Sequence, residues 1–70
     1  MSEIVFMIEE DVDGGFNAQA LVHSIFTEGD TEVEIRKNIL DALKCHFEDE
    51  KDLPKIVRLH FVRDEVLAYA

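Results

Sequence analysis

The segment Gly29–Glu34 constrains this chain more than any other, because its residues fix where a helix begins. Thr31 is followed three residues later by Glu34, which is the spacing of a capping box. In that arrangement the Thr31 hydroxyl accepts a hydrogen bond from the Glu34 N–H, and the Glu34 carboxylate accepts one from the Thr31 N–H. Gly29 and Asp30 end the preceding element. We therefore predict a helix from Thr31 to about Glu48.

The predicted helix carries one wide apolar face. At ~100° per residue, one arc contains five residues: Ile35, Ile39, Ala42, Leu43 and His46. Such a width is typical of a helix that lies across a sheet, and is broader than a coiled-coil seam. His46 is expected in the core or at an interface, and Cys45 is expected to be an inert thiol. Asn38 falls on the polar arc, where we favour a structural role over a partner contact.

Apolar alternation predicts three strands before the helix and one after it. The expected strands cover residues 4–9, 16–22, 24–27 and 55–62, and residues 10–15 form an acidic hairpin turn. The first strand has two apolar faces, which favours a central position in the sheet. We predict an α+β fold of order β-β-β-α-β, in which one helix packs on one face of a small antiparallel sheet. Residues 1–70 form a single domain in this interpretation.

Charge and composition limit the partners that we expect. The seven Lys and Arg residues against sixteen Asp and Glu residues give a net charge of −9, which repels nucleic acid and anionic lipid and attracts a basic partner. We therefore expect no direct DNA binding and no membrane association. A single Cys, no leader and no apolar run near ~20 residues favour a cytoplasmic protein. A core this small favours a homodimer or higher homo-oligomer, formed through a strand edge or the tail at residues 66–69.

One short motif, set in this order of elements, carries a family resemblance. The motif Gly29-Asp30-Thr31-x-x-Glu34-x-x-x-Asn38 follows three expected strands and precedes one. Over residues 3–62 the chain resembles the HicB-like antitoxin family. The resemblance implies a partial ribonuclease-H-like fold without the complete nuclease site, and a HicB-like domain that binds and neutralises HicA, a small basic RNA-cleaving toxin. We interpret the five motif residues as structural residues of the helix start.

The chain departs from that family's pattern at its C-terminus. It stops at Ala70, with no room for the C-terminal DNA-binding segment that many of these antitoxins carry. We therefore expect a short form that does not bind an operator.

Acidic residues in two loops are our candidates for contacting a basic toxin. They are Glu9, Glu10, Asp11 and Asp13 around the hairpin, and Glu48, Asp49 and Glu50 after the helix. We expect a non-catalytic binding domain, and hence no catalytic residue, no metal and no cofactor. A calcium loop starting at Asp11 is rejected, because its twelfth position is Val22 where a Glu is required.

Two alternatives to the antitoxin interpretation stay open. In the first, the chain is an orphan homo-oligomeric domain with no toxin partner. In the second, it is a minimal metal-dependent ribonuclease-H-like nuclease, in which Glu9, Asp11 or Asp13 holds magnesium.

Overall fold

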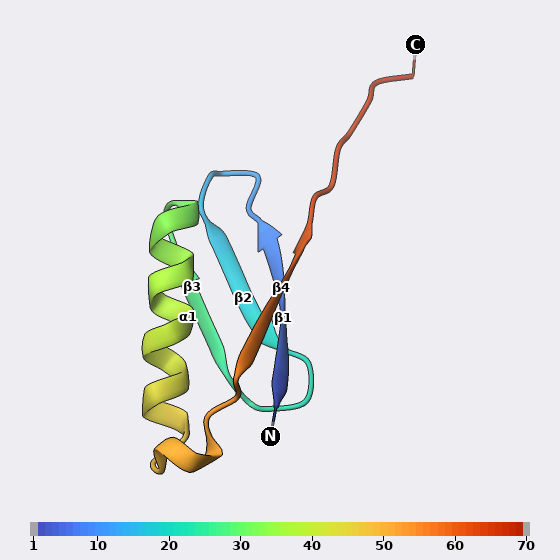
Figure 1. Ribbon diagram of the computed structural model, residues 1–70. Helices are drawn as coiled ribbons and strands as arrows, with labels where there is room; N and C mark the ends of the chain where they lie inside the picture. The colour runs from blue at the N-terminus through green and yellow to red at the C-terminus, as the bar shows by residue number, and fades with distance from the viewer. Residues whose placement is uncertain (1, 70) are drawn as a thin grey trace.

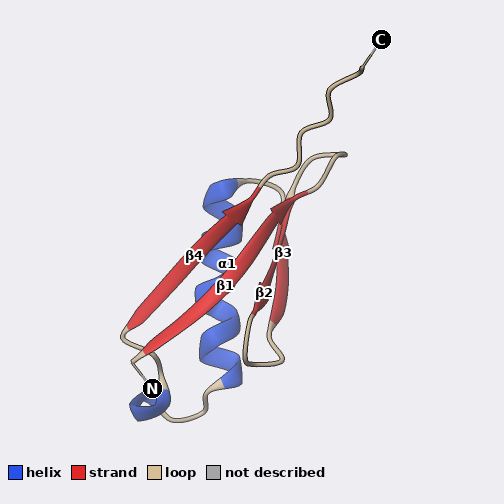
Figure 2. Cartoon of the chain, turned by 90° about the vertical axis from the view of Figure 1, so that its right-hand side faces the viewer, coloured by secondary structure: helices blue, strands red, loops and turns tan. Residues whose placement is uncertain are grey.

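A four-stranded sheet with one long helix on one face makes up the domain (Figure 1). The computed structural model describes residues 2–69. Its elements are β1 (Glu3–Glu10), β2 (Phe16–Ala20), β3 (Phe26–Gly29), α1 (Glu32–His46), the 3-10 turn η1 (Glu50–Asp52) and β4 (Ile56–Val62). The strand order β3-β2-β1-β4 gives β1 a neighbour on each side, and α1 lies behind the sheet in Figure 2. The predicted α+β class, the element order and the central first strand are confirmed.

The direction of β4 differs from our prediction of an antiparallel sheet. β1 and β2 are antiparallel, as are β2 and β3, but β4 runs parallel to β1 with Phe6 opposite Leu59. Two antiparallel steps leave β3 running in the direction of β1, and α1 then carries the chain back along the sheet. The chain therefore enters β4 in the direction of β1, because a helical crossover joins parallel strands. The sheet is mixed, and the prediction was wrong for this strand.

The second and third strands also lie at shifted positions. β2 ends at Ala20, and β3 begins at Phe26 instead of residue 24. Ile25, which we placed in a strand, lies in the connecting loop, where its side chain is 5% exposed and its carbonyl accepts from the Ala20 N–H. An apolar residue that fills the core from a loop has the same sequence signal as a strand residue, which explains the error.

The core lies between the sheet and α1. Among residues 2–69, nine buried side chains form it, from alternate strand positions, one loop and one stripe of the helix: Ile4, Phe6, Ile8, Ala18, Ala20, Ile25, Ile35, Ile39 and Leu43. The three buried helix residues confirm the predicted apolar face. The helix ends two residues early, at His46, which is exposed and not in the core. Its ring lies 5.7 Å from that of His23 and 4.9 Å from that of Phe47, measured between centroids.

The start of α1 has one of the two hydrogen bonds of the predicted capping box, without the predicted bond from the Thr31 N–H to the Glu34 carboxylate. Thr31 has extended backbone angles, and its Oγ1 accepts from the Glu34 N–H at 3.1 Å. The side-chain amide of Asn38 donates to the carbonyl of Glu28 at 2.7 Å, which joins the helix to the end of β3. This bond gives the exposed Asn38 side chain a contact within the fold. Together the two bonds fix both the beginning of α1 and its position on the sheet.

Removing the cap should destabilise the domain measurably. We expect Thr31→Ala to lower the free energy of unfolding by about 1 kcal/mol, because it leaves a helix N–H without its acceptor. Chemical denaturation followed by circular dichroism measures the change. Thr31→Ser keeps the hydroxyl and should stay within about 0.5 kcal/mol of the native chain. Equal stability of Thr31→Ala and the native chain would contradict the assignment of this cap.

Candidate functional site

The turn between β1 and β2 is held by its own hydrogen bonds. The Asp11 N–H donates to the Gly15 carbonyl at 2.9 Å, and the Gly14 N–H donates to the Asp11 carbonyl at 3.0 Å. The Asp11 carboxylate accepts from the Asp13 N–H at 3.1 Å. Gly14 and Gly15 have φ of 95° and 87°, a region that side chains disfavour. The acidic hairpin is thus a defined turn.

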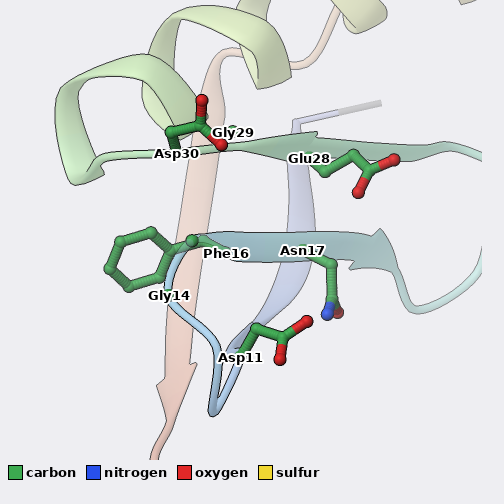
Figure 3. A pocket seen from close by; sticks show the side chains of 8 residues that line it. Asp11, Gly14, Phe16, Asn17, Glu28, Gly29 and Asp30 are labelled. Carbon is green, nitrogen blue, oxygen red and sulfur yellow. The ribbon is translucent and has the colours of Figure 1, made fainter.

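The junction between β3 and α1 lies beside this turn. Strand pairing sets Phe16 opposite Gly29 and Asn17 opposite Glu28. A hollow of about 170 Å³ lies between the two segments, and Figure 3 shows three acidic side chains and one amide around it: Asp11, Glu28, Asp30 and Asn17. Glu28 and Asp30 therefore join the hairpin carboxylates in space.

The segment after β4 reaches the same end of the sheet. A second hollow, of about 260 Å³, is lined by the turn and by the residues that follow β4, including Arg63 and Asp64. Glu9 pairs with Asn17, so Asn17 has Glu9 on one side and Glu28 on the other. We define the acidic end as the seven carboxylates that these segments bring together: Glu9, Glu10, Asp11, Asp13, Glu28, Asp30 and Asp64.

The second predicted acidic loop lies elsewhere. Glu48 and Asp49 lie between α1 and η1, and Glu50 begins η1, at the opposite end of the molecule (Figure 1). The 15-residue helix separates the two ends by roughly 22 Å. Asp49 also has a local role, because its carboxylate accepts from the Lys51 N–H at 3.0 Å at the start of η1. The seven predicted partner-binding residues therefore form two surfaces, and the four hairpin residues belong to the acidic end.

Sequence reasoning missed three members of the acidic end as candidate binding residues. Glu28 and Asp30 lie on another strand and at the helix start, and Asp64 lies about fifty residues after the hairpin. The pairing of Phe16 with Gly29 and of β4 with β1 brings them together. The spacing of residues along the sequence does not predict which residues of distant strands pair.

Among residues 2–69, no group of three or more His, Cys, Asp or Glu side chains is placed to hold a metal ion. On β4, the exposed guanidinium of Arg58 donates to the Glu3 carboxylate; this bond and the attraction between the two charges raise the pKa of Arg58. Within that described part, α1 and the shorter helical turn are too short or too polar to cross a membrane.

Fold and surface together define a small two-layer α+β domain with a carboxylate-rich end. The chain is 46% identical over 66 residues to a UPF0150 protein of Thermotoga maritima, covering 94% of this chain and 91% of that relative. It is 43% identical over 53 residues to a UPF0150 protein of Archaeoglobus fulgidus, covering 76% and 77% respectively. The chain therefore belongs to the UPF0150 family. No protein-family model matches it, and no solved structure does.

Proposed function

We propose that this chain is a non-catalytic protein-binding domain that binds and neutralises a small basic RNA-cleaving toxin, as its resemblance to HicB-like antitoxins implies. The observation that carries the proposal is the acidic end, where seven carboxylates gather on a chain of net charge −9. A surface of this sign attracts a basic protein and accelerates its association. The toxin's substrate is RNA, a polyanion. Carboxylates on this domain therefore compete with RNA for the same cationic groups of the toxin.

The way in which the acidic end is held supports the proposal. Glu9 belongs to a strand paired on both sides, and the hairpin acids lie in a turn closed by three hydrogen bonds. Groups held in place before binding lose less conformational entropy when a partner arrives. The order of the elements and the Thr31 cap agree with the fold that the resemblance implies.

A charge reversal at the acidic end should weaken toxin binding. The probe is a purified HicA-type toxin, and the measurement is calorimetric titration at low salt. We expect Glu10→Lys with Asp13→Lys to weaken binding by about 100-fold, because both carboxylates are exposed and their replacement repels a basic partner. Binding of the native chain should also weaken as salt rises.

The far loop supplies a matched control. Glu48→Lys with Glu50→Lys changes the net charge by the same amount at the other end of the molecule, and we expect less than about a 5-fold effect. Equal weakening by the two pairs would contradict a specific role for the acidic end. No binding by the native chain at low salt would remove the proposal and favour an orphan domain.

An RNA-cleavage assay tests the nuclease alternative. We expect the toxin to cleave RNA and the native chain to stop it in proportion to complex formation. The chain alone with magnesium should leave RNA intact. Cleavage by the chain alone, lost in Asp11→Asn, would replace the binding proposal with a metal-dependent nuclease.

A further inference from the structure

An extended arm follows β4. Residues 63–69 continue in the direction of the strand and project away from the sheet (Figures 1 and 2). Three large apolar side chains of this arm are almost fully exposed, Val66 at 92%, Leu67 at 81% and Tyr69 at 103%. Apolar side chains gathered on one projecting segment are a feature of interaction surfaces.

An uncovered apolar groove runs along the body between α1 and β4. The helix packs against β2 and β3, so Val57 and Leu59 of β4 are only half-buried and Leu40 of α1 is 53% exposed. Two adjoining hollows of about 180 and 200 Å³ share Leu40 and Val57. The outer edge of β4 has no neighbouring strand in the described chain, so its backbone groups on that side are free to pair.

We propose that two copies of this chain exchange their arms. Each arm pairs with the outer edge of the partner's β4, in the antiparallel direction, and places Leu67 and Tyr69 in the groove. The arm leads away from its own body, so it reaches a second copy without a chain reversal (Figure 1). Two-fold symmetry then repeats the same contact in both copies, so that each arm is buried in a groove and each groove is filled by an arm.

The alternation of side chains along a strand supports this pairing. Val57 and Leu59 are opposite buried residues of β1, Ile4 and Phe6, and thus share the helix-facing side of the sheet. Residues two apart share a face, so Leu67 and Tyr69 fall on that same side when the arm continues as a strand. When the two chains pair in the antiparallel direction about a two-fold axis that passes beside one residue of each chain, Leu67 and Tyr69 of one copy lie directly over the groove of the other.

Charge favours the same arrangement. Asp64 and Glu65 at the base of the arm are acidic, and Arg36, over the ring of Phe61, lies at the end of the groove that they reach. Most other surfaces of two chains of charge −9 repel one another. Two reciprocal arms also double the buried area, which lets a short segment approach the ~1,200 Å² at which specific interfaces begin.

Sedimentation velocity of the full chain tests the exchange. We expect a dimer at about 100 μM, a concentration that populates contacts of micromolar Kd. Leu67→Asp with Tyr69→Asp should give a monomer, as should Leu40→Glu in the groove. Val22→Asp with Val33→Asp changes two exposed apolar residues away from the arm and the groove and should leave the dimer intact. Circular dichroism checks that each variant folds. A native monomer, or a dimer that survives the arm and groove substitutions, overturns the proposal.

A disulfide between copies locates the arm directly. In a Cys45→Ser background, chains with Leu40→Cys are mixed with chains with Leu67→Cys and oxidised. We expect a disulfide-linked heterodimer, and none when Val22→Cys replaces Leu67→Cys. Absence of the heterodimer from a solution that sediments as a dimer overturns the exchange. Neither assay contains a toxin, so their outcome is independent of the proposed toxin binding.

Discussion

Replacing Phe6 by Ala is expected to leave most of the chain unfolded at room temperature. Phe6 is completely buried at the middle of β1, between Ala20 on β2 and Leu59 on β4. Removing its ring loses the transfer free energy and leaves a cavity, which together cost about 3–5 kcal/mol. A domain of 70 residues has a net stability of only about 3–5 kcal/mol. The substitution therefore removes most or all of it.

The unfolding is read from amide dispersion in a proton–nitrogen correlation spectrum and from a denaturant titration. Val22→Ala is the matched control, because Val22 is 89% exposed and the change should stay within about 0.5 kcal/mol. A Phe6→Ala chain that unfolds cooperatively near the native midpoint would contradict the central position of β1 in the core.

The features that sequence reasoning found are those set by neighbouring residues. Thr31 and Glu34 lie one helical turn apart, so their hydrogen bond needs no distant part of the chain. Gly14 and Gly15 allow the turn because of their own φ angles. The two apolar faces of β1 predict a central position in the sheet, where a strand has a neighbouring strand at each edge. Each of these is a local pattern, and each was predicted.

The features that it missed depend on packing between distant segments. The parallel direction of β4 follows from the path of α1 along the whole sheet. Ile25 fills the core from a loop, and His46 is exposed although it falls on the apolar arc. The acidic end depends on pairings of residues 16–17 with 28–29 and of β4 with β1. The net charge of the sequence predicts that such a surface is negative, and strand pairing determines where on the molecule it lies.

Gly29→Ala is the second substitution with a large expected effect. Whether it raises or lowers the free energy of unfolding separates two physical causes. At a position that Ala can adopt without strain, replacing Gly usually stabilises a protein by ~0.4–1 kcal/mol through the unfolded chain. Gly29 does not have a positive φ, so its backbone angle alone would permit the gain. However, a Cβ at this position would lie 2.8 Å from the Ile35 nitrogen and 3.1 Å from the Glu34 carbonyl carbon.

Those contacts are with backbone that cannot easily move. The Thr31 cap holds the Glu34 N–H, and the side chain of Ile35 is completely buried in the core. A methyl group at residue 29 therefore pushes the first turn of α1 away from β3. Because overpacking of this kind typically costs 1–3 kcal/mol, we expect Gly29→Ala to lower the free energy of unfolding by about 2 kcal/mol.

Denaturant titration measures this loss, and Gly14→Ala provides the comparison. Gly14 has no atom within 4 Å of an added Cβ, so only its φ of 95° opposes the change, which should cost about 1 kcal/mol. A stabilising Gly29→Ala would show that the helix start is not pressed against β3. The expected loss would instead explain why the motif opens with glycine, since only a residue without a side chain lets the capped first turn of α1 pack against the strand before it.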